Sequence, residues 1–430
     1  MHTLSAHTAD PLAPASPLAH MRLASLDVLR GVAILGVLPL IIQAQAEPWT
    51  ASINPATGGP LSGANGILWI ITYILFTGKF LTILSTVFGA GIFLMASRTD
   101  AASSKNKAGP FSFLRAVAGG ANNRTLHNRR MAGLSIIGLA LVWHALPAAM
   151  LVLFAICGVL AFPLSLWPAQ RAAFAGALCL AFGALCLLGA GALLKAFDTI
   201  EINQTMPVFG VFTSSARFNF LVLFAFLSRT LGLMLIGMAL LKWGAFQTAW
   251  PARRHIMIIT VALFIGYPLV ILGILENVSH RWSMAYAIGV GSQFNYWGAL
   301  IIAGGYASFI MLVCKYAAGK RFRKIMTAIG RMPLSNIAIQ IMVSAWVFFP
   351  PDAAFTTQTD RLEEVILAGI IALAQIILSP FWLRYFRYGP FEWVWRWMTT
   401  GQRPPFIFMN RVFSPYIRAG GANRDDIRRH

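Results

Sequence analysis

The chain has 430 residues, of which 57% are hydrophobic and 11% are charged, and its formal net charge is +20. Soluble domains carry about 25% charged residues, so this composition excludes a soluble globular protein. It predicts an all-α polytopic membrane protein, because a helix satisfies its own backbone polar groups where no water is present.

Residues 1–21 are rich in Ala, Pro, His and Ser and show no helical pattern, which predicts a disordered cytoplasmic tail. A transmembrane helical domain is expected over residues 22–400, and residues 401–430 form a basic cytoplasmic tail. A helix needs about 20 apolar residues to cross a bilayer. On that criterion the sequence predicts about ten spans, at residues 26–46, 79–97, 131–146, 149–167, 172–195, 219–241, 256–275, 287–314, 333–350 and 363–385.

The apolar stretch 66–78 is followed directly by a complete span. An eleventh crossing here would break the alternation of charge between successive gaps, so the stretch is expected to form an interfacial or re-entrant helix.

Lysine and arginine are concentrated in the two tails and in alternate gaps between the apolar runs. Only Lys195, Arg217, Arg281 and Arg361 lie in the other gaps. Positive charge is retained in short cytoplasmic loops, so this asymmetry predicts that both termini are cytoplasmic. The positive charge is explained by membrane orientation and by attraction to anionic lipid, and no nucleic-acid partner is implied.

Ionisable residues inside apolar segments are functional candidates, because burying a charge in the membrane is costly. Asp27 and Arg30 lie three residues apart on one face of a helix start, which predicts an ion pair that anchors the first span. Binding of a donor substrate is the alternative role of these two residues. Lys79 either binds a substrate or extends to the membrane surface. Arg229 lies midway along the sixth span, with no Asp or Glu in any span centre, and is expected to bind a carbonyl, an acid at a helix end or an anionic ligand.

His144, after Trp143 near the outer end of the third span, is the candidate general base, and an interfacial structural role is its alternative. Near the ninth span, Arg331, Asn336 and Gln340 are candidate substrate-binding residues. Asn336 and Gln340 are one helical turn apart, so hydrogen bonds between helices explain them equally well. The four cysteines lack the spacing of metal ligands, and no metal site is predicted.

The segment 389–399 is expected to be an amphipathic helix that lies on the membrane, with its tryptophans as interfacial anchors. Glu392 precedes Arg396 by four residues, which predicts an ion pair along this helix.

Six motifs occur in order along the chain. They are RLASLDVLRGVAILGVL near the N-terminus, TGKFLTILSTVFGAGIFLMASR at 77–98, NRRMAGLSIIGLALVWHAL at 128–146, RTLGLMLIGMALLKWG at 229–244, IGRMPLSNIAIQ at 329–340 and RYGPFEWVWRW at 387–397. This series resembles the YeiB-like family of bacterial inner-membrane proteins, whose C-terminal part, about 220–400 here, is the domain of unknown function 418. The resemblance implies a multi-pass protein of the bacterial inner membrane.

The family is distantly similar to membrane acyltransferases of the heparan-glucosaminide acetyltransferase type. That similarity implies transfer of an acyl group from a cytoplasmic carrier, with acyl-coenzyme A as a candidate donor, to a periplasm-facing acceptor. The chain departs from the family pattern after His144, where Ala149 replaces the usual aspartate. A degenerate site is therefore one alternative.

The sequence thus predicts an acyltransferase-like membrane protein whose partners are the lipid bilayer and a small anionic molecule or acyl acceptor. A transporter of a small solute or lipid and a non-catalytic accessory protein are the alternatives. The two halves of the chain show no convincing repeat, which disfavours a transporter mildly.

Overall fold

A computed structural model describes residues 17–59, 61–104, 112–142, 146–196, 213, 215–246, 250–316, 319–348 and 360–407. The regular elements in these residues are helices, and Phe386 and Ile407 form an isolated antiparallel bridge. The prediction of an all-α fold is confirmed.

The long helices correspond closely to the predicted spans. They are α1 (Pro17–Ala46), α3 (Lys79–Ser104), α4 (Ser112–Val142), α5 (Ala149–Leu164), α6 (Ala169–Ala196), α7 (Ala216–Lys242), α8 (Ala252–Val261) continuing through η5 (Ala262–Gly266) into α9 (Tyr267–Ser279), α10 (Met284–Tyr286) continuing through η6 (Ala287–Gly291) into α11 (Ser292–Lys315), α13 (Pro333–Phe348) and α14 (Arg361–Tyr385). The shorter elements are η1 (Trp49–Ser52), η2 (Pro55–Gly58), α2 (Gly63–Leu75), η3 (Leu146–Ala148), α12 (Lys320–Gly330) and α15 (Pro390–Thr400).

Seven helical segments of the described chain are long and apolar enough to cross a membrane. They are Ala24–Ala46, Gly63–Ser97, Ala169–Ala196, Ala216–Lys242, Ala252–Ser279, Met284–Lys315 and Arg361–Tyr385. Two shorter apolar helices are α5 and α13. The chain is therefore a polytopic membrane protein, and the number of ten spans stays a prediction.

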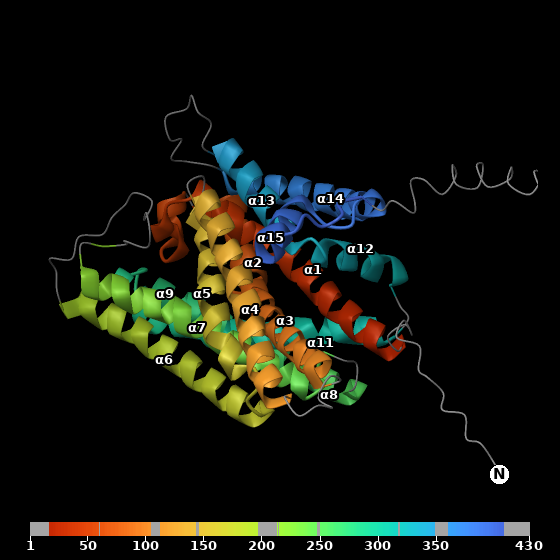
Figure 1. Cartoon of the computed structure of the whole chain (residues 1–430). Helices are drawn as coiled ribbons and strands as arrows, with labels where there is room; N and C mark the ends of the chain where they lie inside the picture. The colour runs from red at the N-terminus through yellow and green to blue at the C-terminus, as the bar shows by residue number, and fades with distance from the viewer. Residues whose placement is uncertain are drawn as a thin grey trace, which may run out of the picture.

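The helices form one bundle, in which α6 and α9 lie toward one side and α13 and α14 toward the other, with α3, α4 and α5 between them (Figure 1). Helix α1 packs along α12 and also contacts α3 and α13. Large apolar side chains point outward from the bundle, among them Phe264, which is 76% exposed, and Trp346, which is 73% exposed. Such apolar outer surfaces are suited to contact with lipid.

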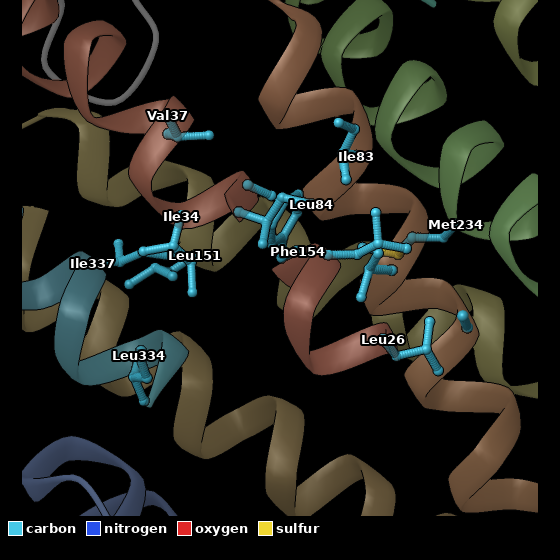
Figure 2. Packing of buried hydrophobic residues seen from close by; sticks show 14 of the residues in the cluster. Leu26, Ile34, Val37, Ile83, Leu84, Leu151, Phe154, Met234, Leu334 and Ile337 are labelled. Atoms are coloured by element: carbon cyan, nitrogen blue, oxygen red, sulfur yellow. The ribbon is translucent and has the colours of Figure 1, made fainter. Parts of the chain in front are cut away.

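The main hydrophobic cluster joins helices that are distant in sequence. Side chains from α1, α3, α5, α7 and α13 approach one another in its centre (Figure 2). Lipid chains are as apolar as leucine, so close packing rather than exclusion of water drives helix association in a membrane. Glycines permit that packing: a Cβ on Gly237 of α7 would lie 1.9 Å from the Thr86 carbonyl oxygen of α3.

The starts of two helices differ from the sequence prediction. Helix α1 begins at Pro17, inside the segment assigned to the tail, and residues 1–16 lie outside the described part of the chain. Helix α4 begins at Ser112, so much of the gap between the predicted spans 79–97 and 131–146 is helical. The stretch 66–78 corresponds to α2 and a turn at Gly78, whose φ of +83° favours glycine, and this turn leads directly into α3.

The predicted orientation can be tested with reporter fusions. A reporter that is active only in the periplasm is expected to work when it is fused near residue 205 or 355, and to be inactive near residue 110 or 322. The physical reason is the concentration of positive charge in alternate gaps. The opposite pattern of activity would reverse every assignment of a residue to a side of the membrane.

Candidate functional site

Two cationic side chains meet where the turn before α3 packs against α11 and α7. Lys79 is fully buried, with 0% exposure. Its Nζ donates hydrogen bonds to the Tyr73 carbonyl oxygen at 2.7 Å and to Asn295 Oδ1 at 2.8 Å. The side chain therefore does not extend to the membrane surface, which was one of the two roles that the sequence left open.

Arg229 is half-buried in α7, and its Cζ lies 4.4 Å from the centre of the Tyr296 ring. The phenol of Tyr296 donates to the Leu180 carbonyl oxygen, which fixes the ring in place. In the described part of the chain, the Arg229 guanidinium makes neither a hydrogen bond nor an ion pair. A cation above a ring is attracted to the ring face but leaves its N–H donors free for other acceptors.

Gly78 shows how close these groups are. A Cβ built on Gly78 would lie 3.7 Å from Arg229 Nη2 and 3.7 Å from Asn295 Nδ2. The next residue is Lys79, so two cations and an amide converge around the backbone of this turn. No carboxylate of the described residues forms an ion pair with Lys79 or Arg229. This cluster of donors, which we call the paired-cation site, is suited to an anionic group.

The structure places the other predicted binding residues in a second region, on α12 and α13. Asn336 Nδ2 donates to the Ile329 carbonyl oxygen, and its Oδ1 accepts from the Ser379 hydroxyl. Gln340 Nε2 donates to the Ile34 carbonyl oxygen and to Gln375 Oε1. These bonds join α13 to α1 and α14, which supports the packing role. Arg331 is exposed at the turn between α12 and α13 and is separate from this network.

Asp27 and Arg30 lie in the tight contact between α1 and α12. Arg30 Nη1 is 2.7 Å from Asp27 Oδ1 and also donates to the Gly330 carbonyl oxygen at 3.2 Å. A Cβ on Gly330 would be 1.9 Å from the Asp27 carbonyl oxygen, so the two backbones touch here. The geometry supports a structural role for this ion pair.

The predicted pair between Glu392 and Arg396 is wrong. Glu392 Oε1 instead accepts hydrogen bonds from the backbone N–H groups of Leu334 at 2.6 Å and Ser335 at 3.0 Å, and its Oε2 accepts from the Ser335 hydroxyl. The guanidinium of Arg396 lies over the Tyr388 ring, with Cζ 4.6 Å from the centroid. Free N–H groups at a helix start attract a carboxylate more strongly than an exposed neighbour does, which explains the difference.

Burial raises the pKa of Glu392, whereas the hydrogen bonds from Ser335 and Leu334 lower it by favouring the carboxylate. Helix α15 is consequently fixed to the bundle through α13, and Trp395 adds a contact by donating to the Arg130 carbonyl oxygen of α4. Helix α15 corresponds to the amphipathic helix that was expected at 389–399, and one of its faces packs against α13 and α4.

The candidate base His144 falls in residues 143–145, which lie outside the described part of the chain. Ala149 is exposed at the start of α5. The other histidine of this region, His127, is buried, with Nε2 3.0 Å from the Gly158 carbonyl oxygen and its ring stacked on Phe162. Burial lowers the pKa of His127, and its contacts indicate a packing role.

The sequence interpretation missed a buried ion pair just beyond the C-terminal end of α1. Arg361 Nε lies 2.9 Å from Glu47 Oε1, and both side chains are almost fully buried. Arg361 also donates to the Pro55 carbonyl oxygen, which ties the loop after α1 to α14. Burial raises the pKa of Glu47, and the charge of Arg361 opposes that rise. The signal was present in the sequence, because Arg361 is one of only four cations in the gaps that are otherwise poor in lysine and arginine.

Comparisons with known proteins agree with the motif series. Residues 240–402 match the family model described as "Protein of unknown function (DUF418)". The chain is similar to the uncharacterized protein YeiB of Escherichia coli strain K12, with 27% identity over 414 residues that cover 89% of this chain and 97% of that protein.

A second relative is an uncharacterized 39.9 kDa protein from the amylase 3′ region of Bacillus acidopullulyticus, which is 23% identical over 90% of this chain and 96% of its own length. No solved structure is significantly similar to the chain. The matched family region includes Asn295 and Tyr296, and the similarity to YeiB extends well beyond it.

Proposed function

We propose that the chain binds an anionic group at the paired-cation site and acts as an acyltransferase in the bacterial inner membrane. The chain carries a DUF418 domain in its C-terminal region and is homologous to YeiB-like proteins over most of its length, and these similarities name no activity. The observation that carries the proposal is a half-buried Arg229 guanidinium that makes no hydrogen bond to the described protein, beside a fully buried Lys79.

Acyl transfer suits such a site on chemical grounds. An acceptor hydroxyl oxygen forms a bond to the thioester carbonyl carbon, the carbon–sulfur bond breaks, and the hydroxyl proton ends on the thiolate that leaves. The tetrahedral intermediate carries a negative oxygen, and fixed cations in a water-poor site stabilise such an oxyanion strongly. Acyl-coenzyme A, an anionic thioester, is the donor that fits this chemistry, and His144 is the proposed base.

A transporter of small anions is the second candidate, and one structural feature favours it. Two π-helical segments, η5 and η6, interrupt the helices around the site, and η6 leads directly into the turn of α11 that carries Asn295 and Tyr296. Irregular turns within helices occur frequently at functional sites. Transporters commonly bind anions beside interrupted helices.

The test measures the thermal shift of the purified protein with acetyl-coenzyme A. Wild type is expected to be stabilised, and Arg229→Met is expected to weaken binding at least tenfold, because a charge-assisted hydrogen bond contributes about 1.5 to 3 kcal/mol. The matched control is Arg217→Met, which removes an exposed arginine from the same helix and should bind like wild type.

An assay of the transfer of labelled acyl groups to membrane acceptors then distinguishes the acyltransferase from the transporter. Transfer by wild type that is lost in Arg229→Met supports the enzyme. Uptake of a labelled anion into vesicles without transfer supports the transporter. A wild type that shows no shift with acetyl-coenzyme A contradicts the acyltransferase proposal.

A further inference from the structure

A second group of cations lines a cavity at the opposite end of the bundle from the Glu47–Arg361 pair, between α1, α11 and α12. The cavity has a volume of about 200 Å³. Lys320, Arg323 and Lys324 line it, together with the hydroxyl-bearing residues Ser25 and Thr327. A water molecule occupies about 30 Å³ in the liquid, so the space is large enough for a group of several heavy atoms.

The local sequence concentrates positive charge at this cavity. Helix α12 starts after Gly319, whose φ of +77° lets the chain turn sharply into the helix. Lys320, Arg323 and Lys324 occupy one face of its first turns, because residues three and four apart are neighbours on a helix. Like charges on one face repel, and a helix N-terminus already carries positive potential, so this arrangement is unfavourable without an anion.

Arg323 is held by protein contacts at the cavity wall. Its Nη1 donates to the Cys314 carbonyl oxygen of α11 at 3.1 Å, which holds the guanidinium in position. Its Nε is buried and finds no hydrogen-bond partner in the described residues. None of the ion pairs of the described chain involves Lys320, Arg323 or Lys324. These three cations are therefore not neutralised within the described chain, which favours an anion in the cavity.

We propose that this cavity binds a phosphate group. Arginine offers a planar fork of donors to phosphate oxygens, lysine offers a compact charge, and the Thr327 hydroxyl supplies a neutral donor. The Ser25 hydroxyl already donates to the Phe246 carbonyl oxygen at 2.7 Å. In the predicted orientation the cavity faces the cytoplasmic side, where anionic phospholipids and soluble phosphate esters both occur. The proposal does not depend on the paired-cation site.

Two probes distinguish the sources of the phosphate. Native mass spectrometry of the protein in nanodiscs that contain phosphatidylglycerol detects a retained phospholipid. Thermal shift with inorganic pyrophosphate in nanodiscs of phosphatidylcholine alone detects a soluble phosphate. The test variant is Lys324→Gln, whose exposed side chain carries no internal hydrogen bond in the described chain. Arg323→Gln is a second variant and also removes the bond to Cys314.

The matched control is Arg321→Gln, which removes the same charge from the same turn but from a residue outside the cavity wall. Wild type and Arg321→Gln are expected to bind at least one probe equally, and Lys324→Gln is expected to bind it at least tenfold more weakly. Retained lipid identifies a headgroup site, and a shift with pyrophosphate alone identifies a soluble phosphate. Binding of neither probe by wild type, or equal losses in Arg321→Gln and Lys324→Gln, would overturn the proposal.

Discussion

Replacing Glu392 by alanine is expected to lower the free energy of unfolding of the purified protein by about 3 kcal/mol or more. The Glu392 carboxylate accepts hydrogen bonds from two backbone N–H groups and the hydroxyl of Ser335 at the start of α13. Hydrogen bonds to charged groups contribute about 1.5 to 3 kcal/mol each, and the contributions are not additive. Alanine would leave these donors buried without acceptors and would detach α15 from α13. Tryptophan fluorescence during heating measures the change.

The control for this prediction is Arg396→Ala. Arg396 is exposed and lies over the Tyr388 ring, and an exposed cation–π contact contributes about 0.5 to 1 kcal/mol. The loss of stability should therefore be several times smaller than for Glu392→Ala. Equal losses in the two variants would contradict the structure and would restore the ion pair along the helix that the sequence pattern suggests.

The pair of residues 392 and 396 also illustrates what the sequence could not predict. A spacing of four residues identifies neighbours on one helix, and it says nothing of a second helix that brings better donors. Glu392 is separated from α13 by the whole of α14, so no local pattern connects it with Ser335. Tertiary contact overrides local pairing wherever a buried helix start needs an acceptor.

The helical segments, by contrast, were largely predictable from sequence. Apolar runs must form helices in a membrane whatever their neighbours are, so composition alone locates them. The differences lie in polar stretches: α12 was not predicted, because its basic residues resemble those of a cytoplasmic loop, and the beginning of α4 was assigned to such a loop. Helix α12 packs along α1, and this tertiary contact decides its structure.

The two cations of the paired-cation site were predicted as candidate binding residues, but their proximity was not predicted. Lys79 and Arg229 stand out because a charge in an apolar segment is costly. Their proximity depends on how α3 and α7 pack, which no pattern within either helix contains. Asn295 and Tyr296 were missed, although three polar residues within an apolar segment, Ser292, Gln293 and Asn295, were a usable signal.

Replacing Arg229 by methionine is expected to raise the thermal stability of the ligand-free protein while it removes the response to an anion. An arginine at the centre of a membrane helix costs about 2.5 to 3.5 kcal/mol on insertion scales. In the ligand-free protein this cost is offset by the Tyr296 ring, and the nearby charge of Lys79 adds repulsion. Methionine is flexible and apolar, so it can fill the space without a charge.

Lys79→Met provides the comparison, because Lys79 makes two hydrogen bonds that Arg229 lacks. The variant would leave the Tyr73 carbonyl oxygen and Asn295 Oδ1 without their donor, and each unpaired group costs about 1 to 3 kcal/mol. Its ligand-free stability should therefore lie below that of Arg229→Met, although both variants lose the response to the anion. If Arg229 serves to bind an anion, it destabilises the ligand-free protein. If Arg229 has a structural role, it stabilises the ligand-free protein. A lower melting temperature of ligand-free Arg229→Met than of wild type would show that Arg229 is structural, and the paired-cation site would then lose its main support.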